Sequence, residues 1–134
     1  MVGVFLNCVD SDFVIAILKG NKSAKELLTK LESEGDIFIT SISIFELTYV
    51  TQEISKKKEK SLRNLIDTLK VISLDKNSAL IASKIGRNLA KEGKMVHPMD
   101  LMIGAMALYN KMVLVTNNIK HFSRIKGLKL LSWT

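Results

Sequence analysis

Acidic residues stand at two positions where a helix is expected to begin. Asp10 follows an apolar run over residues 4–9 that predicts a short strand, and it directly precedes the helix-like segment FVIAILKG. Asp100 lies two residues after Pro98, whose fixed φ suits the first turn of a helix. Each aspartate taken singly is better explained as a helix cap or first-turn acid. In a parallel α/β fold, however, both junctions fall on the edge of the sheet where ligands bind.

Glu46 is informative because of its place on the helix expected after residues 37–40. At about 100° per residue, its direction falls between Ile42 and Val50, with Phe45 and Leu47 on either side. A carboxylate inside such an apolar arc is costly to bury without a cation or hydrogen-bond partners. Glu46 therefore either reaches solvent along the helix surface, faces a polar pocket or pairs with a base.

Asp10, Glu46 and Asp100 would repel one another in a single crevice unless a divalent cation were bound. Hard oxygen donors without a Cys and His cluster favour Mg²⁺ or Mn²⁺ over zinc. Setting these three acids aside leaves 10 acidic residues against 20 lysines and arginines, so the rest of the surface carries about +10. An acidic pit within a basic surface suits metal-assisted hydrolysis of a nucleic-acid phosphodiester.

The composition favours one domain over residues 1–134 that acts in the cytoplasm. The single cysteine, Cys8, is best interpreted as a small buried hydrophobe. No apolar run is long enough to span a membrane. The net charge of +7 suggests a polyanionic partner. One basic cluster fits a nucleic-acid surface and a merely solvated face equally well, and it comprises Lys56, Lys57, Lys58, Lys60 and Arg63.

Strand-like and helix-like segments alternate along the chain, which predicts an α/β fold with a mainly parallel sheet covered on both faces. Five strands are expected, over residues 4–9, 37–40, 71–74, 113–115 and 128–131. Helices are expected to begin at a capping box of Ser23 and Glu26, at Ser41 or Ser43, at Asn77 and at Pro98. A further helix is expected to carry Leu62, Leu65, Ile66 and Leu69 on one stripe. The helix that begins at Ser41 or Ser43 is expected to reach Glu53, and Gly35 and Gly93 are expected to end the helices before them.

Four segments together resemble the successive motifs of the PIN-domain ribonucleases, most of all the VapC toxins of VapBC toxin-antitoxin pairs. They are FLNCVDSDFVIAIL, ITSISIFEL, PMDLMIGAMAL and VLVTNNIKHFSRIKGLKL, so the resemblance spans the whole chain. It implies a three-layer α/β/α fold with a mainly parallel five-stranded sheet. It also implies Mg²⁺- or Mn²⁺-dependent cleavage of RNA that leaves 5′-phosphate and 3′-hydroxyl ends, a homodimer, and a VapB-like antitoxin that inserts a segment near the acidic pocket.

The resemblance also implies roles for individual residues. Asp10, Glu46 and Asp100 match the family's acidic metal ligands, and Asn118 stands where many members have a fourth acid and some toxins have asparagine. His97 is expected to be a cap or packing residue. The supporting residues are Ser11, whose hydroxyl would support the first aspartate, Asp12, which would partly replace the missing charge, and Thr116. Substrate or structural contacts are expected from Lys120, His121 and Arg124.

Three other interpretations of the chain remain open. A catalytically lapsed PIN-like module would hold RNA or a protein without cutting, as Asn118 hints. A receiver-type phosphoacceptor domain also clusters acids, but it gives Glu46 no role and does not account for the basic charge. A PIN nuclease of RNA processing would share the chemistry and differ in biology, and a small antitoxin gene beside this one would distinguish the toxin.

Overall fold

A computed structural model describes residues 6–50 and 55–134. Its sheet consists of β1 (Leu6–Val9), β2 (Ile37–Thr40), β3 (Lys70–Ile72), β4 (Met112–Val115) and β5 (Lys129–Leu131). The helices are α1 (Ser11–Leu18), α2 (Lys22–Glu34), α3 (Ser41–Val50), α4 (Lys56–Asp67), α5 (Lys76–Lys91), α6 (Pro98–Tyr109) and α7 (Ile119–Phe122).

The strands pair in the order β3-β2-β1-β4-β5, and all four pairings are parallel. From the central β1 the chain builds outward through β2 and β3, then returns to add β4 and β5 on the other side. The order therefore reverses between β1 and β4. In open α/β sheets, the crevice outside the carboxyl ends of two such strands is where ligands bind.

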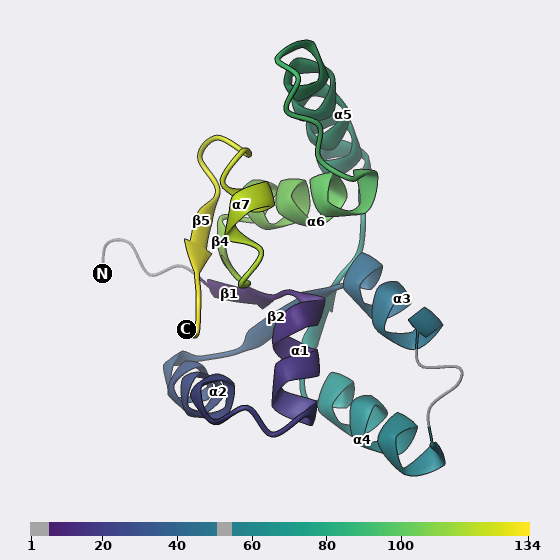
Figure 1. The fold of residues 1–134 in the computed structure, drawn as a ribbon, viewed down its shortest axis with the longest axis vertical. Coiled ribbons are helices and arrows are strands. Elements are labelled where there is room, and N and C mark those ends of the chain that lie inside the picture. Colours follow the sequence, from purple (N-terminus) through teal and green to yellow (C-terminus); the bar gives the residue numbers. More distant parts are fainter. Residues whose placement is uncertain (1–5, 51–54) are drawn as a thin grey trace.

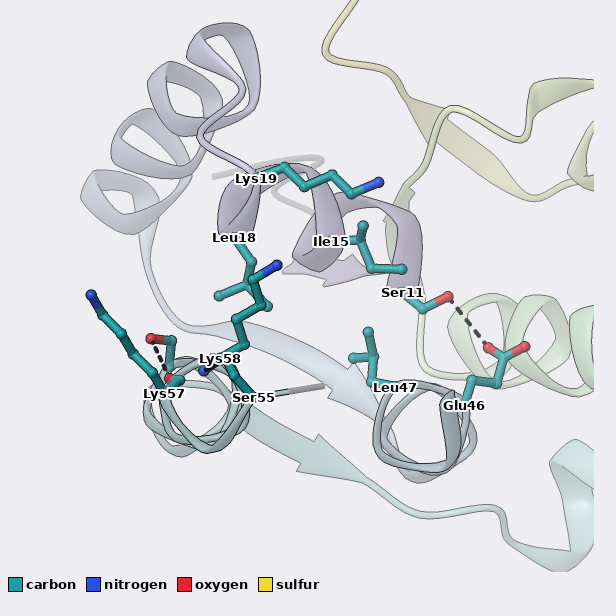
Figure 2. Close-up of a pocket in the computed structure, with 10 residues that line it drawn as sticks. Ser11, Ile15, Leu18, Lys19, Glu46, Leu47, Ser55, Lys57 and Lys58 are labelled. Carbon is teal, nitrogen blue, oxygen red and sulfur yellow. Dashed lines mark hydrogen bonds between the residues drawn. The ribbon is translucent and has the colours of Figure 1, made fainter. Parts of the chain in front are cut away.

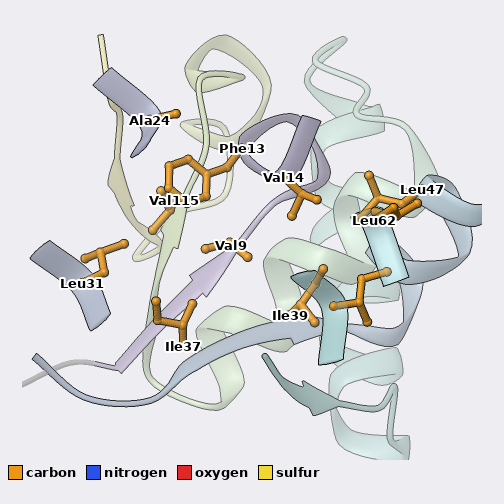
Figure 3. Close-up of a cluster of buried hydrophobic side chains, with 11 residues drawn as sticks. Val9, Phe13, Val14, Ala24, Leu31, Ile37, Ile39, Leu47, Leu62 and Val115 are labelled. Carbon is orange, nitrogen blue, oxygen red and sulfur yellow. The ribbon is translucent and has the colours of Figure 1, made fainter. Parts of the chain in front are cut away.

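Helices cover both faces of the sheet, so the expected three-layer α/β/α fold is confirmed (Figure 1). Successive strand residues point to opposite faces. Val9 and Val115 therefore pack with Phe13, Leu31 and Leu62 from α1, α2 and α4 (Figure 3). On the other face, the neighbouring strand residues pack against α6, α7 and the turn after it, in a cluster that includes Cys8, Leu114, Ile103, Phe122 and Ile125.

Cys8 is fully buried, as its interpretation as a small hydrophobe requires. Burial, together with the nearby charge of Asp10, raises the pKa of its thiol to about 12. Since the thiolate is the reactive form of cysteine, Cys8 has a packing role and contributes no chemistry to the site.

Three of the expected helix caps are wrong. Asn21 caps α2 by accepting from the Ala24 N–H at 2.9 Å, so Ser23 and Glu26 form no capping box. Asp75, and not Asn77, caps α5 by accepting from Ser78 N–H at 2.8 Å. In each case several residues able to cap lie close together, and the helix uses the first of them.

The third error concerns α3, which starts directly from the end of β2. Neither Ser41 nor Ser43 caps it, because the Thr40 hydroxyl accepts from the Ser43 N–H at 2.9 Å. Because α3 starts at Ser41, directly after β2, Glu46 lies near the carboxyl end of the sheet. The expected continuation to Glu53 lies outside the described residues, as do Val4 and Phe5 of the first expected strand.

The remaining boundaries differ only slightly from those expected. β3 covers residues 70–72 and not 71–74, because Lys70 already pairs with Phe38 and the chain then leaves the sheet for the cap of α5. Gly93 follows the end of α5 with φ 70°, a left-handed conformation that glycine adopts without strain.

Gly104 allows α6 to approach the turn after α7 closely. A Cβ at this position would collide with the Ile125 side chain and lie 3.5 Å from the Phe122 ring. We expect Gly104→Val to lower the free energy of unfolding by about 1–3 kcal/mol, the usual cost of overpacking a core. Urea denaturation measures the change. The control is Ala90→Val at an exposed position of α5, and equal stability of the two variants would contradict this packing.

Candidate active site

Asp10 lies at the point where the strand order reverses. It follows β1 directly, and its backbone N–H donates to the Val115 carbonyl at 3.0 Å, which joins it to the end of β4. Its carboxylate caps α1 by accepting from the Ser11 N–H at 2.8 Å. Only 5% of Asp10 is exposed. The cap interpretation of this residue is therefore correct, and it places a buried carboxylate at the carboxyl end of β1, next to the end of β4.

Thr116 holds Asp10 from the neighbouring strand end. Its buried hydroxyl donates to Asp10 Oδ2 at 2.8 Å and lies 3.2 Å from Asp12 Oδ2. The Thr116 hydroxyl oxygen also accepts a hydrogen bond from the Asn118 N–H at 3.0 Å. A hydroxyl has one proton to donate, so it cannot satisfy both carboxylates at the same time. Asp10 and Asp12 therefore compete for one donor.

The two oxygens of Asp12 have different surroundings. Oδ2 also accepts from the Asn117 N–H at 2.9 Å, which links the first turn of α1 to the loop between β4 and α7. Oδ1 is buried and has no hydrogen-bond partner among the described residues. A buried oxygen without a partner costs about 1–3 kcal/mol, and more when it is charged. Asp12 thus has an unsatisfied acceptor at the site.

Glu46 enters the site from α3 and is half-buried. The Ser11 hydroxyl donates to Glu46 Oε1 at 3.4 Å, which Figure 2 shows as the contact between α1 and α3. The hydroxyl of Ser11 was expected to support the first aspartate. Only its backbone N–H contacts Asp10, and the hydroxyl serves Glu46. Of the alternatives considered for Glu46, pairing with a lysine or arginine does not occur among the described residues.

Asp100 lies in the first turn of α6 and is half-buried. His97 caps this helix, since its Nδ1 accepts from the Met99 N–H at 3.2 Å, and its expected role as a cap is confirmed. Burial raises the pKa of Asp100 and so does the charge of Asp12, while His97 and His121 lower it. Asp100 is therefore electrostatically coupled to the aspartates that follow β1.

Burial raises the pKa of every carboxyl in this group, and neighbouring carboxylates raise the pKa of Asp10, Glu46 and Asp100 further. The pKa of Asp10 rises to about 7, first because of burial and then because of Asp12. The pKa of Glu46 is raised by burial and by Asp100. Burial also raises the pKa of Asp12, against the hydrogen bonds that it accepts. None of the four forms an ion pair with any lysine or arginine in residues 6–50 and 55–134. The site therefore holds excess negative charge.

The donor set suits a hard divalent cation, because it offers carboxylate oxygens, one of them orphaned, and no thiolate. Within the described part of the chain, no three His, Cys, Asp or Glu side chains are close enough to enclose an ion by themselves. Mg²⁺ in proteins usually keeps several waters and takes one or two carboxylates together with substrate phosphates. An open, partly assembled set of acids is compatible with that mode.

The other expected site residues follow the end of β4. Asn118 directly precedes α7, and its side chain makes no capping hydrogen bond. Lys120 and His121 are exposed on α7. Arg124 instead makes a structural contact, because its Nη1 donates to the Met95 carbonyl at 2.8 Å and ties the turn after α7 to the segment before α6.

A groove with a volume of about 790 Å³ runs from this site along α1 toward α4 (Figure 2). Ile15, Leu18 and Leu47 form its apolar floor, Glu46 lies at one end, and Lys57 and Lys58 line the other. The sequence interpretation missed this groove. The sequence of α1 offered a signal, because this helix carries more apolar residues than the core can bury. In the structure, 40% of Leu18 is exposed.

Comparison with known proteins identifies the family. The PIN domain family model matches residues 8–128. Ribonuclease VapC2 of Rickettsia felis is 33% identical over 123 residues, which cover 90% of this chain and 91% of that protein. The tRNA(fMet)-specific endonuclease VapC of Salmonella typhimurium is 35% identical over 98 residues, which cover 71% of this chain and 74% of that protein.

Solved structures of VapBC complexes share the fold. The VapBC2 complex of Rickettsia felis, bound to a DNA fragment from its promoter, superposes with a TM-score of 0.88 at 25% identity and covers 97% of this chain and 100% of that chain. DNA-bound VapBC of Salmonella typhimurium superposes with a TM-score of 0.87 at 27% identity, and the match covers 98% of this chain and 100% of that chain. The chain therefore belongs to the PIN-domain family, and its curated relatives there are VapC ribonucleases.

Proposed function

We propose that this protein is a metal-dependent endoribonuclease and the toxin of a VapBC-type toxin-antitoxin pair. The observation that carries the proposal is a group of four carboxylates, Asp10, Asp12, Glu46 and Asp100, that interact electrostatically near the carboxyl end of β1. Among the described residues they form no ion pair with Lys or Arg, in a chain with a net charge of +7. The relatives named as ribonucleases support the reaction class. The similarity to VapBC complexes supports the antitoxin partner.

The proposed metal ligands are Asp10, Glu46 and Asp100, with Asn118 as a neutral donor. When bound, Mg²⁺ or Mn²⁺ would activate water and shield the charge of the phosphate under attack. The protein's own part is to orient the donors. Thr116 and the Ser11 N–H fix the two oxygens of Asp10, and the Ser11 hydroxyl restrains Glu46. The expected products have 5′-phosphate and 3′-hydroxyl ends.

RNA is the proposed substrate, and the excess of basic residues would hold its backbone by charge. Lys120 and His121 are exposed on α7 beside the strand end and are our candidates for phosphate contacts. Arg124 is a weaker candidate, because its guanidinium already donates to a backbone carbonyl. Action on cellular RNA implies that the protein works in the cytoplasm. The described residues include no helix both long and apolar enough to cross a membrane.

The groove beside Glu46 is our candidate for the antitoxin site. Its apolar floor would accept the nonpolar face of an inserted segment, and its acidic end would attract a basic side chain that blocks the carboxylates. An antitoxin seated there would make cleavage conditional on its release.

We also propose a homodimer of the single domain formed by residues 1–134. The Phe45 and Tyr49 side chains on α3 support this dimer, because their stacked rings are 50% and 65% exposed and could be buried against a second copy of the chain.

Leu18→Asp is expected to weaken capture of the VapB-like protein encoded beside this gene, because it puts a charge on the apolar floor of the groove. Co-expression followed by affinity purification measures how much antitoxin remains bound. Leu80→Asp is the matched control, since Leu80 is exposed on α5 and does not line the groove. Equal recovery of the antitoxin with both variants would contradict this placement.

Inducible expression in a bacterial host tests the toxin role. Wild-type protein without antitoxin should arrest growth, and Glu46→Gln should not, because glutamine keeps the side-chain shape and removes the charge. Asp67→Asn, at an exposed position of α4, should still arrest growth. If the Glu46→Gln variant arrests growth as strongly as wild type at equal protein level, toxicity does not depend on the acidic site.

A further inference from the structure

We propose that Asp12 supplies a fourth carboxylate to the site while it also fixes the loop between β4 and α7. This inference rests on the proposed metal-dependent function, and it assigns a different role to each oxygen of the side chain. Oδ2 is satisfied by hydrogen bonds from the loop, whereas Oδ1 is buried without a partner.

The loop contact connects segments more than a hundred residues apart in the sequence. Asp12 Oδ2 accepts from the Asn117 N–H at 2.9 Å. The side-chain oxygen of Asn117 accepts in turn from the Ser132 hydroxyl and, at 3.4 Å, from the Trp133 N–H. The Trp133 ring packs on Phe13 at 5.1 Å between centroids. Asp12 is therefore held at a defined position relative to the strand end.

Oδ1 of Asp12 has no positive partner among the described residues, and the neighbouring carboxyl of Asp10 can only share a proton with Asp12. No lysine or arginine among them pairs with Asp12, and Asp10 Oδ2 competes for the single proton of the Thr116 hydroxyl. The charge of Asp12 also reaches the rest of the site, because it raises the pKa of Asp10, Glu46 and Asp100. A cation in the crevice would relieve Asp12 together with the other three acids.

Asn118 offers an independent position from which to test this assignment. It follows directly on the loop that Asp12 holds, and its backbone N–H donates to the Thr116 hydroxyl. An aspartate at this position would add a carboxylate to a residue whose backbone already contacts Thr116. If the site requires a fourth negative charge near this hydroxyl, that charge can be moved from Asp12 to position 118 with recovery of metal binding.

The experiment is a Mn²⁺ titration of metal-free protein by isothermal calorimetry, with thermal unfolding measured beside it. We expect Asp12→Asn to weaken Mn²⁺ binding by about 10- to 100-fold. The amide oxygen can still accept from the Asn117 N–H, so the metal-free unfolding temperature should not fall. The double variant Asp12→Asn with Asn118→Asp should recover most of the lost affinity. The exposed-site variant Asp67→Asn should bind Mn²⁺ as wild type does.

The outcomes separate this inference from the proposed function. Wild-type affinity in Asp12→Asn would overturn the role of Asp12 and leave the metal-dependent nuclease standing. Failure of the wild-type protein to bind Mn²⁺ would overturn both. A third outcome is loss of Mn²⁺ affinity together with a lower metal-free unfolding temperature and no recovery in the double variant. It would show that Asp12 only stabilises the loop between β4 and α7, and it would overturn its role as a fourth carboxylate.

Discussion

Replacing Asp100 with asparagine should lower the rate of RNA cleavage by at least about 100-fold, the order of effect seen when a key electrostatic group is removed from an active site. RNA binding should change little, because the substitution removes one negative charge from a strongly basic chain. Asp100 faces the coupled acids from the first turn of α6. Asparagine keeps the size of the side chain but neither its charge nor its affinity for a hard cation.

Single-turnover cleavage measures the first quantity and filter binding the second. The fold should persist, because the loss of a favourable first-turn charge, worth about 0.3–1 kcal/mol, is offset by relief of repulsion from Asp12. Asp67→Asn is the matched control at an exposed position. Cleavage by Asp100→Asn at a rate near that of wild type would show that the acids do not perform the chemistry.

In metal-free buffer, the protein should be more stable at about pH 5 than at about pH 8. Burial and the charge of Asp12 raise the pKa of Asp10 from 3.8 to about 7. The folded protein therefore holds this proton up to about pH 7, whereas the unfolded chain releases it near pH 4. The stability from this group is complete below the unfolded pKa and is lost as the pH rises through the folded one. The loss between the two conditions is on the order of 3 kcal/mol.

Urea denaturation in EDTA across this range measures the effect, and Asp10→Asn isolates its source. The variant should show a flatter pH dependence and should be more stable than wild type at the alkaline end. Added Mg²⁺ or Mn²⁺ should restore the stability of the wild-type protein at alkaline pH and should not change the stability of the variant. If the stability of wild type and variant depends on pH in the same way without metal, the loss of stability at alkaline pH does not come from Asp10.

The sequence allowed the three main acids to be chosen because topology determines where strand ends meet. Asp10 follows a strand, Asp100 begins a helix, and Glu46 lies in the apolar arc of α3, so each is marked by a local pattern. The fold class followed from the alternation of strands and helices. These features depend on residues near one another in the chain, and they are therefore readable without coordinates.

The contacts that refine the site could not be predicted in this way. The hydrogen bonds from Thr116 and Asn117 to Asp12 join residues more than a hundred positions apart. The Ser11 hydroxyl faces Glu46 because α3 starts directly at the end of β2, whereas the sequence pattern indicated only Ser41 or Ser43 as its cap. The groove needs the relative placement of α1 and α4, which no local pattern encodes.

Incubation of the purified protein, free of antitoxin, with an end-labelled pool of structured RNAs tests the central claim most directly. In Mg²⁺ or Mn²⁺ the account predicts discrete cuts with 5′-phosphate ends, which EDTA abolishes and added metal restores. An RNA pool that is bound but left intact would contradict the nuclease and favour a catalytically lapsed binding module. Cleavage that continues at full rate in EDTA would contradict the role of the acids as metal ligands.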